Sequence, residues 1–297
     1  MKKLFSATLY LIYIYCTALL IVSCSNDGGG SGEEFTNPEN KNENRGNSYS
    51  RRIEIPALNS NDIFITHTTR VAGKDNITYS ISHNAERKHS RWVAFTFDDS
   101  NREIAWQRKS WKYTEWGGDP FQPDPEMPES YVFTKSEINK NGFDRGHLVA
   151  SYDRVYSKDA NEQTFYYSNM SPMYNDFNTG LWSNLEGVVQ KHGRNESFCD
   201  TLYVVKGGTI NPGYYKQVGT CRTVPLYYFM AILSRKNNIY NGIAFWLEHE
   251  RDLEGTIWDY AMTIDELEEK SGIDFFCNLP DKTENSVERV YYPSKWQ

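Results

Sequence analysis

The sequence of 297 residues is poor in cysteine and histidine, with five and six residues, and it lacks a net positive charge. Its formal charge of −7 argues against a protein that coats nucleic acid without specificity, because affinity for a polyanion comes from positive charge. We find no internal repeat, which excludes the repeat architectures. The single long apolar run, from Leu4 to Val22, lies at the start of the chain.

That apolar run has the features of an export signal. Two lysines precede it, and it ends in Ser23-Cys24, which predicts a signal peptide over residues 1–24. A small residue before a cysteine at this place resembles the bacterial lipobox, in which Cys24 would carry a lipid and become the mature N-terminus. The alternative is a short transmembrane anchor of 19 residues. Both interpretations put the rest of the chain outside the cytoplasm, in the cell envelope, either periplasmic or surface-exposed.

The remainder divides by composition into two parts. Residues 25–50 are mostly Gly, Ser, Asn, Glu and Lys, which predicts a flexible tether. Residues 51–297 are rich in aromatic and β-branched runs and suffice for one large core, so we expect a single domain there.

Cysteine usage allows at most one disulfide in this domain. Cys16 and Cys24 fall in the leader, which leaves Cys199, Cys221 and Cys277 in an oxidising compartment. Three cysteines permit one bridge and one free thiol, and the sequence leaves the pairing open.

Short apolar runs alternate with a few helical patterns. The expected strands lie at 62–67, 77–82, 91–98, 202–206, 225–234 and 240–247. The expected helices lie at 157–165, 179–192 and 264–271. These elements predict an α+β domain with a mixed, mainly antiparallel sheet.

One group of residues has the side chains of a catalytic site. It consists of Asp144-Arg145-Gly146-His147 and of Asn178, which follows His147 by 31 positions and stands at the start of an expected helix. A strand that ends at His147 and a helix that begins near Asn178 would form a ββα arrangement around one cation. His147 would activate water, the Asn178 carbonyl would hold Mg²⁺, and Arg145 would stabilise the extra negative charge of a phosphodiester transition state.

Three polar residues extend this group. Glu186 lies eight residues after Asn178, about 80° further round the same helix, and would orient metal-bound water. Gln190 follows one turn later and adds a polar contact. Asn169 would brace the histidine or a metal-bound water.

These residues resemble the DNA/RNA non-specific endonuclease family of the ββα-metal class. Three blocks are similar to the family's: Asp144 to His147, Ser168 to Pro172, and Asn178 to Glu186. The resemblance implies that His147 is the general base, that Asn178 is the sole direct protein ligand of Mg²⁺, with Mn²⁺ as a substitute, and that the other residues have supporting roles. The supporting catalytic residues would be Arg145, Asn169 and Glu186, and the substrate-binding residues Arg108 and Asp144.

The sequence departs from the family pattern at several points. The proline that often follows the signature is absent from Leu148 to Ser151, and Met173 stands where glutamine is common. Gln190 occupies the place of an arginine that aids catalysis in some members. None of these changes removes His147 or Asn178. Upstream basic residues would supply a groove for phosphate: Arg87, Lys88, Arg91, Arg102, Arg108, Lys109 and Lys112.

The sequence therefore predicts a lipid-anchored endonuclease that cuts DNA and RNA with little base preference, and it predicts no protein partner. Its membrane contact would be the N-terminal lipid. The alternative from another class is a non-catalytic surface lipoprotein that binds glycan or nucleic acid, since 21 tyrosines and 8 tryptophans offer stacking surfaces. A phosphatase or pyrophosphatase with similar site chemistry is a further enzymatic alternative.

Overall fold

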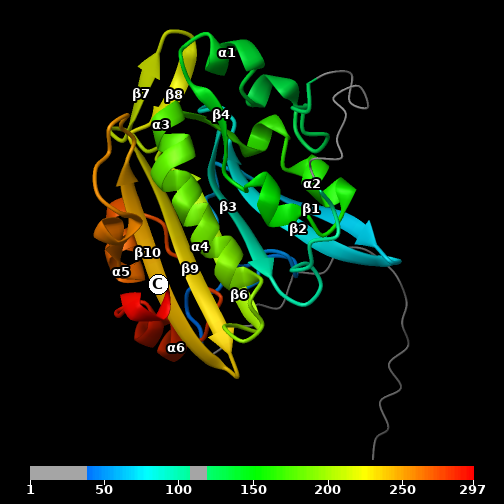
Figure 1. Ribbon diagram of the computed structural model, residues 1–297, viewed down its shortest axis with the longest axis vertical. Coiled ribbons are helices and arrows are strands. Elements are labelled where there is room, and N and C mark those ends of the chain that lie inside the picture. The colour runs from blue at the N-terminus through cyan, green and yellow to red at the C-terminus, as the bar shows by residue number, and fades with distance from the viewer. Residues whose placement is uncertain (1–38, 108–118) are drawn as a thin grey trace, which may run out of the picture. The chain divides into compact units, whose positions relative to one another are not determined.

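The computed structural model describes residues 39–107 and 119–297, in the unit formed by residues 36–297. Its centre is a seven-stranded sheet in the order β1-β2-β3-β6-β9-β10-β11, counted over these residues (Figure 1). Every neighbouring pair is antiparallel. The strands are β1 (Ile63–Val71), β2 (Lys74–Asn84), β3 (His89–Phe97), β6 (Thr201–Gly208), β9 (Tyr227–Lys236), β10 (Ile239–Glu248) and β11 (Ala261–Met262).

Smaller elements surround this sheet. Two further antiparallel pairs are β4 (Asp144–His147) with β5 (Met170–Met173), and β7 (Tyr215–Val218) with β8 (Cys221–Pro225). The α-helices are α1 (Lys135–Asn139), α2 (Lys158–Gln163), α3 (Asn175–Phe177), α4 (Ser183–Gly193), α5 (Ile264–Ser271) and α6 (Asp281–Val287). The other helical turns are η3 (Glu129–Tyr131), η4 (Ser151–Arg154), η5 (Tyr167–Asn169), η6 (Asn178–Trp182), η7 (Ile257–Tyr260) and η8 (Pro293–Lys295). The α+β class and all six predicted strands are confirmed.

The central strands are buried on both faces, which explains why they read as continuous apolar runs. On one face, Phe95 and Val204 pack with Trp182 and Leu185 from the helix that passes over the sheet. On the other face, Trp92, Val205 and Phe229 lie in a second cluster with apolar residues of α5 and α6. Figure 1 shows α4 crossing in front of β6 and β9. The sheet is thus a layer between two helical covers.

The predicted helices are found at 158–163, 183–193 and 264–271. Thr263 caps α5: its side-chain oxygen accepts from the Glu266 backbone N–H, and the Glu266 carboxylate accepts from the Thr263 backbone N–H. Gly193 ends α4, but not through a left-handed cap. A Cβ at Gly193 would lie 2.5 Å from the Phe97 ring, so the glycine serves close packing of helix on sheet.

Residues 39–50, the described part of the predicted flexible tether, pack against the domain instead. Asn40 is buried, and its Nδ2 donates to the Cys277 and Leu279 carbonyls at 2.8 and 2.6 Å. Asn44 is buried as well, and its Nδ2 donates to the Pro56 carbonyl at 3.0 Å. This segment is therefore held in place by asparagine side chains that hydrogen-bond to backbone carbonyls, and not by apolar side chains. Its polar composition gave no sign of such packing. Cys24 and the rest of the leader lie outside the described residues.

The three cysteines of the domain are free thiols, and all three are buried. Burial raises the pKa of Cys199 to about 11 and that of Cys221 to about 12. Within residues 39–107 and 119–297, no helix is both long and apolar enough to cross a membrane.

Candidate active site

The predicted ββα arrangement is present. β4 pairs with β5 so that Gly146 lies opposite Ser171 and His147 opposite Met170, and the chain then enters α3, η6 and α4. The indole of Trp182 donates to the His147 carbonyl at 3.2 Å, which ties the helix to the end of β4. The two elements that carry His147 and Asn178 are therefore fixed against each other.

The His147 ring lies in an aromatic corner. Its centroid is 4.9 Å from that of Phe165, edge to face, and 5.7 Å from that of Phe121. Arg145, on the same face of β4, places its guanidinium 3.6 Å from the centre of the Phe121 ring. The Arg145 Nη1 also donates to both carboxylate oxygens of Asp119 at 3.2 Å. Phe121 thus orients both side chains at once.

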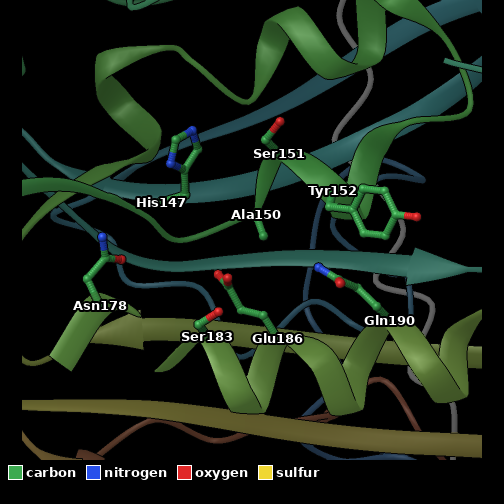
Figure 2. A pocket seen from close by; sticks show the side chains of 8 residues that line it. All are labelled: His147, Ala150, Ser151, Tyr152, Asn178, Ser183, Glu186 and Gln190. Atoms are coloured by element: carbon green, nitrogen blue, oxygen red, sulfur yellow. The ribbon is translucent and has the colours of Figure 1, made fainter. Parts of the chain in front are cut away.

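Asn178 is held by the first residue of the motif. Its Nδ2 donates to Asp144 Oδ2 at 3.2 Å, and the Asn175 amide donates to the same oxygen at 2.9 Å. Because the amide nitrogen faces Asp144, the Asn178 carbonyl oxygen turns toward Glu186 (Figure 2). Asp144 therefore orients a candidate metal ligand, a role that differs from the predicted contact with substrate.

A cleft of about 250 Å³ joins the two sides of the motif. Figure 2 shows His147 and Asn178 at one end and Tyr152 and Gln190 at the other, with Glu186 pointing in from α4. The complete lining is His147, Ala150, Ser151, Tyr152, Asn178, Ser183, Glu186 and Gln190. Four of these lining residues, His147, Asn178, Glu186 and Gln190, were candidates from the sequence.

Behind Glu186 lies a buried polar network. Lys206 of β6 is fully buried, with its Nζ 2.9 Å from Asp153 Oδ2 and 3.9 Å from Glu186 Oε1. Gln190 Nε2 donates to Asp153 Oδ1 at 3.0 Å. Burial raises the pKa of Glu186 to about 8, and the Lys206 charge opposes that rise. The Glu186 carboxyl group that faces the cleft therefore holds its proton more strongly than an ordinary glutamate. A cation bound in the cleft would favour the ionised form of this group.

Asn169 lies beneath the cleft rather than in its wall. It is fully buried, its Oδ1 accepts from Val149 N at 2.8 Å, and its Nδ2 donates to the Val149 and Thr164 carbonyls at 3.0 and 2.7 Å. The Asn169 carbonyl also accepts from Leu148 N. These bonds fix the backbone directly after His147, so Asn169 is a positioning residue.

The described residues of the predicted basic groove, Arg87, Lys88, Arg91 and Arg102, all have partners within the fold, and Arg87 pairs with Glu86 at 3.2 Å. Arg91 pairs with Asp62 at 2.5 Å, and Lys88 pairs with Glu137 at 3.2 Å. Arg102 is buried and donates to the Asp200 carbonyl. None of these groups lines the cleft. Arg108, Lys109 and Lys112 lie outside the described residues.

Sequence reasoning missed several groups near the site. Tyr152 lines the cleft without belonging to any spaced motif, and Ser183 lines it from within the Asn178 to Glu186 block, where the sequence did not single it out. Asp119 reaches Arg145 from a loop far away in sequence. Lys206 did leave a signal, because it is a lone charge at the end of the apolar run Tyr203–Val205, and such a charge needs a buried partner.

The chain was compared with known proteins. A family model described as DNA/RNA non-specific endonuclease matches residues 59–282. A nuclease from Nostoc sp. is 29% identical over 221 residues, which cover 71% of this chain and 75% of that protein. Nuclease C1 from Cunninghamella echinulata is 28% identical over 220 residues, covering 69% of this chain and 83% of that protein.

A solved structure shares the fold. A chain from the crystal structure of the EndoG/EndoGI complex superposes with a TM-score of 0.59 at 18% sequence identity. The match covers 74% of this chain and 89% of that chain.

Proposed function

The chain belongs to the DNA/RNA non-specific endonuclease family and is an endonuclease that hydrolyses nucleic acid, and we propose from this premise that His147 and Asn178 form its catalytic pair. The observation that carries the proposal is the shared cleft, in which His147 from β4 faces Asn178 and Glu186 from the helix. His147 acts as the general base that takes a proton from the attacking water. The aromatic corner of Phe121 and Phe165 holds the ring in one orientation for that transfer.

The residues of the cleft fit a hard divalent cation. The Asn178 carbonyl oxygen faces the cleft because Asp144 takes the amide nitrogen, and Glu186 offers a carboxylate that orients water. Oxygen donors and room for several waters suit Mg²⁺, with Mn²⁺ as a substitute. Such an ion supplies Lewis acidity near the scissile phosphate and the leaving oxygen.

Arg145 stabilises the negative charge that develops on the phosphate. Its guanidinium is preorganised by the Phe121 ring and by Asp119, and only Nη1 donates to Asp119 among the described residues. The other N–H groups of the guanidinium are the donors for phosphate oxygens. The substrates are DNA and RNA cut with little base preference, since contacts to the phosphate backbone carry no sequence information.

We further propose that the protein is anchored to the cell envelope by a lipid on Cys24. The support is the sequence alone, with its apolar run followed by Ser23-Cys24. Metabolic labelling with an alkyne fatty acid tests it: the natural protein should take up label and the Cys24→Ala protein should not. Equal labelling of both proteins, or of neither, contradicts the anchor.

A magnesium titration of plasmid cleavage tests the catalytic pair. Asn178→Ala removes the proposed ligand, so its cleavage should need at least about tenfold more Mg²⁺ and have a lower maximal rate. Asn184→Ala, an exposed amide on the same helix that does not line the cleft, should titrate like the unaltered protein. Identical magnesium dependence in the Asn178→Ala protein rules out the assigned ligand.

A further inference from the structure

Tyr152 is the one large aromatic side chain in the described lining of the cleft. It is 50% exposed, although the rings that surround His147 are mostly covered. Figure 2 shows it beside Gln190, at the end of the cleft opposite Asn178. Exposure of a tyrosine ring to a cleft that holds catalytic groups makes it available to a bound substrate.

A cation supports this ring from within the protein. The Arg194 guanidinium carbon lies 4.6 Å from the centre of the Tyr152 ring, and Arg194 Nη2 donates to the Tyr152 carbonyl. The same guanidinium packs over Phe97 at 5.2 Å. The positive charge of Arg194 thus lies against the Tyr152 ring. The exposed part of the ring forms the rim of the cleft.

The backbone that carries Tyr152 is also rigid. Its neighbours Asp153 and Arg154 are fully buried: Asp153 is bonded to Lys206 and Gln190, and Arg154 donates to the Thr96 carbonyl at 3.0 Å. A stacking surface on a fixed backbone loses little conformational entropy when a base binds.

We propose that Tyr152 is a stacking platform for the base of an unpaired nucleotide next to the scissile phosphate, so that the enzyme favours single-stranded nucleic acid. This inference rests on the proposed function, which places the phosphate at His147 and Asn178. A base enclosed in a duplex offers its edges, whereas an unpaired base offers the face that an aromatic ring stacks on. At this end of the cleft Gln190 is neutral and donates to Asp153, and the Arg194 guanidinium is engaged by the Tyr152 and Phe97 rings and by the Tyr152 carbonyl. The exposed part of the Tyr152 ring is therefore the surface offered to a base.

Binding of two polymers with equal charge tests the platform. The purified full chain is titrated in EDTA, which prevents cleavage, with a fluorescent 12-mer of thymidylate and with a 12-mer of abasic units. The natural protein should bind the thymidylate polymer about tenfold more tightly, since one base stacked on an aromatic side chain contributes that much. Tyr152→Ala should lose most of that preference, while Tyr152→Trp should keep it.

Tyr292→Ala is the matched control. Tyr292 is 52% exposed and also has a cation over its ring, Lys295 at 4.9 Å, but it lies on a different surface from the cleft. The control should keep the preference for thymidylate. The platform is disproved if Tyr152→Ala discriminates between the two polymers as the natural protein does, or if the natural protein binds both equally.

Cleavage of the same sequence as a single strand and as a duplex separates this proposal from the proposed function. Tyr152→Ala should lower kcat/KM for the single strand more than for the duplex, mainly through KM. A natural protein that cuts both substrates but binds the thymidylate and abasic polymers equally would overturn the platform alone. A protein that cuts neither substrate but keeps the Tyr152-dependent preference would overturn the proposed function alone.

Discussion

Asp144 determines which atom of Asn178 faces the cleft, through a single hydrogen bond of 3.2 Å. We predict that Asp144→Ala weakens magnesium activation of cleavage by about tenfold or more, because the amide loses the partner that fixes its orientation. The concentration of Mg²⁺ at half-maximal rate measures this effect. Asp176→Ala, an exposed carboxylate on α3, removes equal charge and should change nothing. An equal increase in the half-maximal Mg²⁺ concentration in both proteins would mean that loss of negative charge, and not loss of the Asn178 contact, causes the effect.

Lys206 is the buried cation behind the site, 2.9 Å from Asp153. Lys206→Met leaves the Asp153 carboxylate buried without its charge partner, so we expect unfolding by urea to require about 3–5 kcal/mol less free energy. The comparison is Lys236→Met, whose partner Asp200 is 2.8 Å away but whose ion pair is exposed. That change should cost less than about 1 kcal/mol. Similar losses in the two variants would mean that Lys206 is not a buried partner of the network.

At the scale of elements, the close contact of β4 with β5 depends on Gly146. A Cβ there would lie 2.3 Å from Sδ and 2.5 Å from Cγ of Met173, which is fully buried, so Gly146→Ala must displace the Met173 side chain or the strand that carries it. We predict about 1–3 kcal/mol of lost stability and roughly a hundredfold loss of cleavage, since His147 ends the strand that contains Gly146. Thermal melting and the initial rate of plasmid cleavage measure the two effects.

Two further proteins sharpen that test. Met173→Ala in the Gly146→Ala background removes the clashing sulfur and should restore part of both properties. Gly187→Ala on α4 has open space around its Cβ and should melt at the same or a higher temperature. A Gly146→Ala protein with normal activity would contradict the argument from strand spacing.

Elements with long apolar runs were predictable from the sequence, and irregular ones were not. β3, β6, β9 and β10 are recognisable because they are buried on both faces. β5 was missed because it contains Pro172, which argues against a strand, yet it occurs in a short two-stranded pair. β7 and β8 were missed because they are short and partly polar.

The site divides in the same way. His147 could be predicted because it ends a strand, and Asn178 and Glu186 because they lie eight residues apart in consecutive helical segments, η6 and α4. The single continuous helix that the sequence predicted for these two residues is interrupted at Gly180, where the backbone is not helical. Asp119 and Lys206 reach the site from distant segments, and only the tertiary fold brings them there. The packing of residues 39–50 depends likewise on contacts with the C-terminal segment, more than 200 residues away.

At the scale of the whole molecule, the region of α5 and α6 concentrates carboxyl groups. Oxygens of Asp265, Glu268 and Glu288 lie within 4.8 Å of one another. Burial, with smaller contributions from neighbouring carboxylates, raises the pKa of Glu268 to about 8, that of Glu284 to about 7 and that of Glu288 to about 10. The folded protein therefore keeps protons that the unfolded chain releases above its ordinary pKa of about 4.5.

This difference predicts that stability falls as pH rises. The unfolded chain binds fewer protons than the folded one between pH 4.5 and the raised pKa values, so the free energy of unfolding decreases across that window. The melting temperature should be higher at pH 5 than at pH 8. Glu288→Gln should reduce this drop, and Glu269→Gln, on the exposed side of α5, should not. A melting temperature that rises from pH 5 to pH 8 in the natural protein would refute the prediction.

The most direct test of the catalytic account is degradation of supercoiled plasmid and of total RNA by the natural protein and by His147→Ala, each with Mg²⁺ and with EDTA. Thermal melting of both proteins establishes that the variant is folded. The account predicts that both substrates disappear only with Mg²⁺ and only with His147 present. Cleavage by a folded His147→Ala protein at the natural rate, or cleavage that persists in EDTA, would contradict it.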